Sequence, residues 1–197
     1  MDIEKTLEAF KKNNYEVIYF QTGKEAAKYL DQEIDRSTVC FGDFETLISL
    51  KLYDLLSKHN EVFDPQHGEF FKEAKEGMQA EYFVTSVNGA TEDGVLVNLD
   101  GTGNRVAGTL FGHRKVFLVF GVNKIEENLD KAIWRVRNVA APKNAMRHGF
   151  QTPCAIKGDK CYDCSSKDRI CNGLMIHYKK MRHEEMEIVI INENLGF

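Results

Sequence analysis

Four of the chain's five cysteines lie within eighteen residues, in the stretch TPCAIKGDKCYDCSSKDRICN at residues 152–172. Their spacing is Cys154-x6-Cys161-x2-Cys164-x6-Cys171, symmetric about a central CxxC. The Gly, Asp, Lys, Ser and Tyr residues between them favour a solvated loop over the interior of a helix or strand. Such a loop has too few apolar side chains to hold its own shape. Its fold therefore depends on what binds the four thiols.

Three kinds of thiol chemistry compete for this loop. Two disulfides would need an oxidising compartment, whereas the chain starts MDIEKTLEAF without an apolar signal segment, which indicates the cytoplasm. A thioredoxin-like pair normally opens a helix after a strand, and here CxxC lies inside a loop with two further cysteines. We therefore expect a four-thiolate site for zinc or for an iron–sulfur cluster, which the spacing does not distinguish. Zinc would only fold the loop, whereas a cluster could carry electrons.

Composition bounds the remaining possibilities. A chain of 197 residues with 43% hydrophobic residues can bury a sizeable core, and we expect one domain over 1–197. The net charge of -4 provides no basic stripe to neutralise phosphates, which argues against nucleic acid as a partner. The longest apolar runs, such as VFLVFGV, are far shorter than the roughly 20 residues that cross a bilayer. The sequence leaves the oligomeric state undetermined.

Hydrophobic periodicity alternates between strands and helices along the chain. Apolar residues recur at helical spacing in 2–13 and 23–34, and the apolar runs 15–20 and 37–41 predict strands. This alternation predicts a mainly parallel sheet covered by helices on both faces. Further expectations are a single helix after Gly42, a central strand at 113–125, a long helix over 127–149 turned or kinked near Pro142, and a C-terminal β-hairpin formed by 173–180 and 185–197.

Polar residues follow several predicted strands. Gly42 and Asp43 come directly after one strand and open a helix, which makes them candidates for binding a ligand at the sheet edge. The alternative is an ordinary turn in which Asp43 caps the helix. Asn123 and Lys124 follow the predicted central strand on the same side. We expect these strand ends to form one cleft.

The segment 85–105 carries most of the remaining candidate chemistry. Arg105 and the backbone amides near it would suit a phosphate or carboxylate, and Glu92 is a candidate general base. The alternative is that the acids lie in a solvated hairpin turn and Arg105 pairs on the surface. The Gly-x-Gly here falls short of a dinucleotide fingerprint. The candidate ligand-binding residues in this segment are Thr85, Asn88, Asp93, Gly101, Gly103, Asn104 and Arg105.

The chain resembles the small stand-alone branch of the lactate-utilisation (LUD) domain family. The resemblance rests on TSVNGATEDGVLVNLDGTGNRVAGTLFGHRKVFLVFGVNKIEENLDKAI, VRNVAAPKNAMR, the four-cysteine segment and the ending VIINENLGF. It implies an α/β three-layer sandwich like that of ribose-phosphate isomerases and CoA-transferases. Relatives work with iron–sulfur proteins in bacterial L-lactate oxidation. Two departures are Gly42-Asp43-Phe44, where many members have a Gly-Gly-Ser turn, and Glu92-Asp93-Gly94, where lactate-operon members tend to have Glu-Thr-Gly.

The resulting hypothesis is a cytoplasmic LUD-type protein that acts as an accessory or electron-transfer component in lactate or hydroxy-acid utilisation. Its four cysteines would bind the metal, its strand-end cleft a small anionic metabolite, and an iron–sulfur redox protein is a candidate partner. One alternative is an enzyme acting on a phosphorylated or CoA-linked metabolite, with Glu92 as base or nucleophile. Another is a regulatory anion-binding protein with structural zinc. The sequence does not decide whether a reaction is catalysed.

Overall fold

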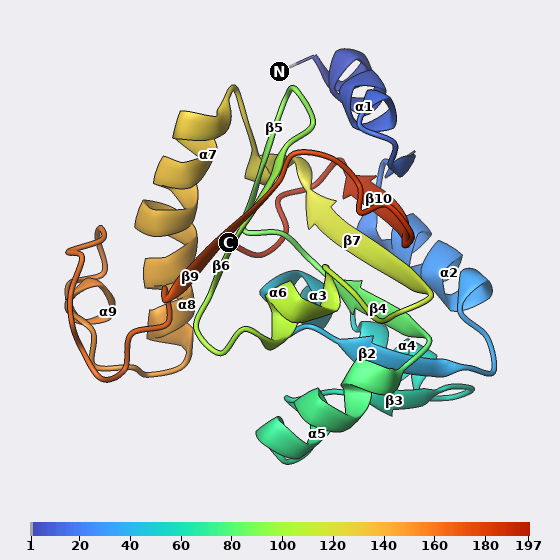
Figure 1. The fold of residues 1–197 in the computed structure, drawn as a ribbon, viewed down its shortest axis with the longest axis horizontal. Helices are drawn as coiled ribbons and strands as arrows, with labels where there is room; N and C mark the ends of the chain where they lie inside the picture. Colours follow the sequence, from blue (N-terminus) through green and yellow to red (C-terminus); the bar gives the residue numbers. More distant parts are fainter. Residues whose placement is uncertain (1) are drawn as a thin grey trace.

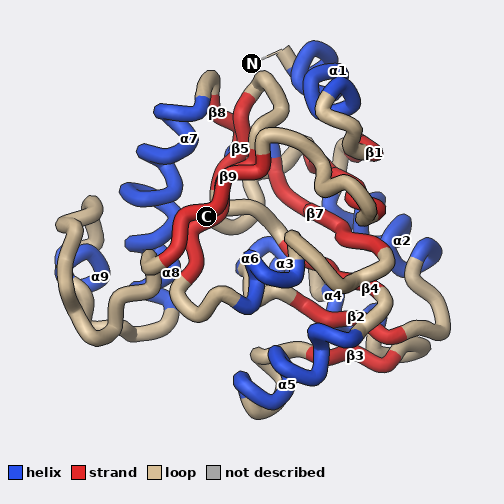
Figure 2. Tube along the Cα trace, viewed as in Figure 1, coloured by secondary structure: helices blue, strands red, loops and turns tan. Residues whose placement is uncertain are grey.

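A computed structural model describes residues 2–197, and the predicted parallel sheet lies at its centre. All neighbouring strands in this sheet run parallel, with their carboxyl ends at one edge (Figure 1, Figure 2). The strand order is β1 (Glu16–Phe20), β10 (Glu185–Ile191), β7 (Lys115–Gly121), β4 (Tyr82–Thr85), β2 (Thr38–Phe41) and β3 (Glu61–Phe63).

Both faces of the sheet are buried, because successive strand residues point to opposite sides. In β7, Phe117 and Val119 join one hydrophobic cluster, and Val116 and Leu118 join the other. The first cluster is covered by α2 (Gly23–Glu33), α3 (Glu45–Ser49) and α4 (Leu52–Leu56). The second is covered by α1 (Ile3–Lys12) and the η1 turn (Gly77–Gln79) that follows α5 (Phe70–Glu76). The three-layer sandwich is therefore confirmed.

Local sequence signals set the ends of the first two helices. The side chain of Asp2 accepts a hydrogen bond from the amide of Lys5, which fixes the start of α1. Thr22 and Glu25 form a reciprocal capping box at the start of α2. These bonds satisfy amides that the first turn of a helix leaves without partners.

A second, four-stranded sheet lies beside the first, and it corrects the predicted C-terminal hairpin. Strand β9 pairs antiparallel with β6, whereas β10 lies between β1 and β7 in the main sheet. The hairpin prediction was wrong because β10 is buried on both faces and so requires a central position, while β9 exposes Leu174 at a sheet edge. The order is β8 (Ile125–Glu126), β5 (Gly89–Thr91), β6 (Leu96–Asp100) and β9 (Gly173–His177).

Two predicted helices are interrupted. The single helix expected after Gly42 is split into α3 and α4, because Lys51 adopts a left-handed conformation with φ 53°. The long helix near Pro142 runs as α7 (Leu129–Arg135), a π-helical turn (Val136–Ala140) and α8 (Ala141–Arg147). Proline has no amide hydrogen, so the turn before it cannot keep the regular bonding ladder. The remaining helices are α6 (Asn104–Gly108), the η2 turn (Val122–Lys124) and α9 (Pro153–Lys157).

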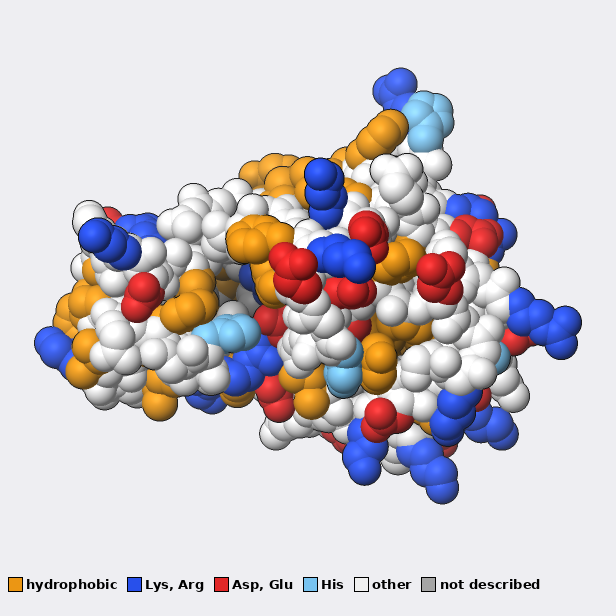
Figure 3. Space-filling view, turned by 90° about the horizontal axis from the view of Figure 1, so that it is seen from below, with side chains coloured by type: hydrophobic (Ala, Val, Ile, Leu, Met, Phe, Trp, Pro, Cys, Tyr) orange, Lys and Arg blue, Asp and Glu red, His pale blue; other side chains and the backbone are white. Residues whose placement is uncertain are grey.

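The surface carries both signs of charge. On the face shown in Figure 3, acidic, basic and hydrophobic side chains are interspersed. This distribution is in keeping with the modest net charge of -4. Within residues 2–197, none of the helices has both the length and the apolar character needed to cross a membrane.

Candidate functional site

Lys124 lies at the carboxyl end of β7, fully buried beneath the loops that follow β2 and β4. Its ammonium nitrogen donates to the hydroxyl oxygens of Thr46 at 2.9 Å and Ser86 at 3.1 Å. Among residues 2–197, no carboxylate forms an ion pair with it. Burial lowers the pKa of Lys124 well below its usual value, and the charges of Arg135 and Arg105 act in the same direction. The site therefore disfavours the charged form of Lys124 relative to an exposed lysine, while the two hydroxyl oxygens accept two of its hydrogens.

Gly42 and Thr85 meet where β2 and β4 end. A Cβ atom on Gly42 would lie 2.9 Å from the Cβ of Thr85, so only glycine allows this approach. The hydroxyl of Thr85 is buried and has no hydrogen-bond partner within the described chain. Both residues were predicted ligand-binding residues, and the structure brings them together with the aliphatic part of Arg105.

Asp100 organises the loop between β6 and α6. Its carboxylate accepts hydrogen bonds from the amides of Thr102 at 3.2 Å and Val106 at 3.0 Å, and lies 3.4 Å from the guanidinium of Arg105. Burial opposes ionisation, but the charge of Arg105 and these amides outweigh it and lower the pKa of Asp100. Arg105 also donates to the carbonyl of Leu99 and lies over the ring of Phe44. Arg105, the predicted anion-binding residue, is thus paired within this loop with the carboxylate of Asp100.

Asp43 does not cap a helix. The N-cap of α3 is Phe44, whose side chain makes no capping bond, so that alternative was wrong. The carboxylate of Asp43 instead accepts a 2.7 Å bond from Arg147 and lies 3.2 Å from the ring nitrogen of His148, both at the end of α8. Burial opposes its ionisation, but the bond from His148 and the charge of Arg147 hold the pKa of Asp43 well below its usual range.

A hollow of about 270 Å³ brings several predicted residues to the cysteine segment. One side is formed by Asp43 and the Asp100–Arg105 loop, and another by Asn144 and His148 of the α8 end. Ile170, the residue before Cys171, closes the hollow. The predicted residues that line it are Asp43, Gly101, Asn104 and Arg105.

Other predicted residues lie elsewhere. Asn88 bonds to Asn98 and to the amide of Leu99, and so connects β5 to β6. Asn123 accepts a bond from the amide of Leu195 and anchors the C-terminal segment. Glu92 and Asp93 line a separate hollow against α1, where the amide of Glu92 donates to the carbonyl of Glu126. Gly103, with φ 95°, gives the 100–105 loop its turn.

Sequence reasoning left three polar residues around this edge out of the candidate site. Ser86 is a hydrogen-bond partner of Lys124, and Arg147 and His148 are partners of Asp43. Ser86 directly follows β4, so its position after a buried strand was a usable signal. Arg147 and His148 lie more than 100 positions after Asp43, and no local pattern predicts that contact.

The four cysteines lie on α9 and the loop after it. All four are half-buried and unpaired, and the fifth, Cys40, is buried in the core. Burial raises the pKa of the Cys171 thiol; Arg169 lowers it, and the other three loop cysteines raise it. The four thiols are therefore close enough to interact electrostatically. Within residues 2–197, however, no three His, Cys, Asp or Glu side chains converge closely enough to hold a metal ion.

Hydrogen bonds surround the central CxxC. The amide of Asp163 donates to the sulfur of Cys161 at 3.3 Å, and the guanidinium of Arg137 lies 3.9 Å from the same atom. Arg169 donates to the carbonyl oxygens of Cys164 and Cys171. The first two donors therefore face the sulfur of Cys161, and Arg169 holds the backbone at Cys164 and Cys171.

The C-terminal end of the cysteine segment is hydrogen-bonded to the Asp100–Arg105 loop. Asn172 donates from its amide to the carbonyl of Asp100 at 2.9 Å and from its side chain to the carbonyl of Gly101 at 3.1 Å. A Cβ on Gly101 would lie 2.9 Å from the Cα of Ile170. The two loops are therefore in backbone contact.

Comparison with known proteins gives a family and a fold. A family model described as LUD domain matches residues 3–191. The chain is also similar to the crystal structure of a DUF162 family protein from Deinococcus radiodurans, with 10% identity, a TM-score of 0.55, and coverage of 96% of this chain and 95% of that chain. At this identity the likeness establishes the fold alone. No curated protein matches the chain.

Proposed function

The chain belongs to the LUD domain family, and we propose that it acts in lactate or hydroxy-acid utilisation as an accessory or electron-transfer component with a metal at its four cysteines. The observation that carries this proposal is the contact of the cysteine segment with the Asp100–Arg105 loop. A metal centre there would lie beside the hollow that Ile170 closes.

The donor chemistry of the cysteine segment supports a thiolate-bound metal, although the four thiols would have to move closer together to coordinate one. Cys154, Cys161, Cys164 and Cys171 supply four sulfur ligands from one segment, the set preferred by zinc and by iron–sulfur clusters. A bound cluster would supply one-electron transfer, whereas zinc would supply only loop stability. The amide of Asp163 and the guanidinium of Arg137 would compensate the negative charge of the sulfurs.

The metal is tested by purifying the protein without oxygen and measuring its visible spectrum, metals and acid-labile sulfide. Iron with sulfide and a broad absorption band supports electron transfer, whereas one zinc per chain favours the regulatory alternative. Cys161→Ser should lose the metal. Cys40→Ala, which removes the buried thiol outside the loop, should keep it. Absence of both metals from intact wild-type protein contradicts the proposal.

We assign the small anionic metabolite to the 270 Å³ hollow, which is lined by Arg105 and His148. Asp100 and Asp43 also line this hollow and already contact Arg105 and His148, so an anion would bind by replacing one of these two carboxylates. Calorimetry with L-lactate tests the assignment. Arg105→Met should weaken the binding of L-lactate. Arg36→Met, which changes an exposed arginine outside the hollow, should not. Equal binding by both variants contradicts it.

A further inference from the structure

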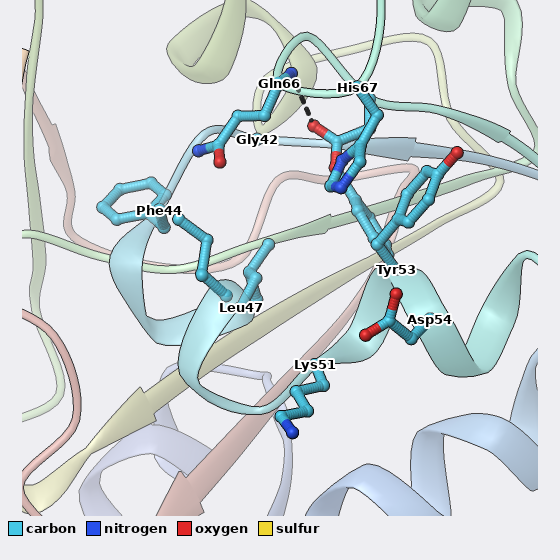
Figure 4. A pocket seen from close by; sticks show the side chains of 11 residues that line it. Gly42, Phe44, Leu47, Lys51, Tyr53, Asp54, Gln66 and His67 are labelled. Carbon is cyan, nitrogen blue, oxygen red and sulfur yellow. Dashed lines mark hydrogen bonds and ion pairs between the residues drawn. The ribbon is translucent and has the colours of Figure 1, made fainter.

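A second hollow, of about 350 Å³, opens beside the carboxyl ends of β2 and β3 (Figure 4). Its volume falls in the range of roughly 300–1,000 Å³ typical of small-molecule pockets. Neither the cysteine segment nor the Asp100–Arg105 loop contributes to it. One wall is apolar, with Phe41, Phe44, Leu47 and Ile48, and the other carries Tyr53 and His67.

His67 is held in one orientation. Asp64, 7% exposed and directly after β3, accepts a 2.8 Å bond from Nδ1 of His67 through one carboxylate oxygen. Its other oxygen accepts the amide of Gln66 at 2.9 Å. The imidazole also stacks on Tyr53, with ring centroids 3.6 Å apart and planes within 1°. Because the carboxylate only accepts, Nδ1 carries a proton, and in the neutral imidazole the lone pair therefore lies on Nε2.

His59, which also contacts carboxylates, has no ring nitrogen left for a ligand. In His59, both ring nitrogens are bonded to acids, Nε2 to Asp31 at 2.9 Å and Nδ1 to Asp35 at 3.0 Å. That histidine ties surface elements together. For His67, no residue in the described chain bonds to Nε2. The hollow thus contains an oriented imidazole with one nitrogen available to a ligand.

The charges around the hollow select against anions. Its lining contains one cation, Lys51, and two acids, Asp54 and Asp64. Figure 4 shows the side chain of Lys51 directed away from His67. An anionic ligand would therefore find a net negative lining, whereas an uncharged molecule would gain from the apolar wall. An acceptor nitrogen in such a setting fits a hydroxyl donor.

We propose that this hollow binds a small, uncharged, largely apolar alcohol or phenol whose hydroxyl donates to Nε2 of His67. The same nitrogen is placed to act as a general base. It would take the hydroxyl proton, with the O–H electron pair staying on the ligand oxygen and Asp64 stabilising the imidazolium. Asp64 is a positioning residue. This site goes beyond the proposed metal function and does not depend on it.

Phenol, toluene and benzoate are the probes. Their binding is followed by NMR of protein labelled with ¹⁵N at histidine. We expect phenol to bind about tenfold more tightly than toluene, because only phenol makes the hydrogen bond, and to shift Nε2 of His67. Benzoate should bind more weakly than phenol. Equal affinities of phenol and toluene, or phenol shifts confined to other histidines, would overturn the proposal.

Two matched variants sharpen the test. His67→Phe keeps a ring to stack on Tyr53 and should lose about tenfold in phenol affinity without changing toluene binding. His59→Phe removes a histidine outside the hollow and should change neither. Asp64→Asn should broaden the single Nδ1-protonated signal into a tautomer mixture. The same measurements in Cys161→Ser should agree with wild type, so a failed metal site leaves this result intact. Equal phenol loss in both histidine variants would contradict the proposal.

Discussion

Asp43 and Arg147 form a 2.7 Å ion pair between the residues just after β2 and the last turn of α8. The side chains are 11% and 18% exposed, so water screens the pair only in part. The same carboxylate also contacts His148 and accepts a bond from Gln66. It thereby joins the end of α8 to the loops after β2 and β3, at the edge of the 270 Å³ hollow.

Asp43→Asn should lower the free energy of unfolding at pH 7 by about 1–3 kcal/mol, because it removes the charge that pairs with Arg147 at 2.7 Å and leaves Glu45, at 3.6 Å, as its carboxylate neighbour. The folded pKa of Asp43 is depressed, so its contribution is present above the unfolded pKa and is lost as pH falls toward the folded value. The gap between wild type and variant should therefore narrow from pH 5 to pH 2. Urea titrations measure it. Asp54→Asn, at an exposed position, should show little change, and a gap independent of pH would contradict the assignment.

Lys124 should make the free energy of unfolding increase with pH. Its folded pKa is depressed below the unfolded value, so the unfolded chain binds more protons and stability rises with pH between the two pKa values. The slope is at most about 1.4 kcal/mol per pH unit for one proton. Denaturant titrations from pH 7 to 10 should show this rise in wild type and its loss in Lys124→Met. Lys58→Met removes an exposed lysine and should keep it. If stability changed with pH in the same way in all three proteins, the lowered pKa of Lys124 would be contradicted.

Gly101→Ala should separate the cysteine segment from the Asp100–Arg105 loop. The added methyl group would lie 2.9 Å from the Cα of Ile170, closer than real Cβ contacts allow. We expect lower metal retention and a destabilisation of about 1–3 kcal/mol. Gly173→Ala is the control, because its nearest new neighbour is the carbonyl of Asp100 at 3.9 Å. Metal content after gel filtration and thermal melting report the difference. Unchanged metal content in Gly101→Ala would show that the contact is not needed.

If the four cysteines bind a metal as proposed, a chelator should loosen the cysteine loop without opening the sheet. The loop between α9 and β9 has no regular secondary structure, whereas β7 and β10 lie in the interior of the main sheet. Hydrogen exchange should therefore accelerate across residues 158–171 and stay slow in β7 and β10. Chelator-treated Cys161→Ser, which lacks a ligand, should show no further change. Acceleration spread over the whole chain would indicate instead that the metal supports the entire fold.

The sequence predicted those features that depend on local periodicity. Apolar spacing located α1, α2 and the buried strands, since each such element must bury one face wherever it packs. The family resemblance gave the sandwich, and the family match supports it. Lys124 and Asp43 were also singled out from their positions after buried strands.

Features that depend on long-range pairing were decided by the tertiary structure. The sequence predicted that residues 185–191 pair with the preceding strand in a hairpin. They lie instead between β1 and β7, because a strand buried on both faces requires a neighbour on each side. The sequence predicted Glu92 as a candidate general base in the strand-end cleft, but the turn between β5 and β6 places it beside α1. The contacts of Asp43 with Arg147 and of His67 with Asp64 and Tyr53 create the environments on which chemistry depends. The sequence by itself determined which segments form strands and helices, because hydrophobic periodicity is local; only the tertiary structure decided which polar groups meet, because burial and charge pairing arise between segments far apart in the chain.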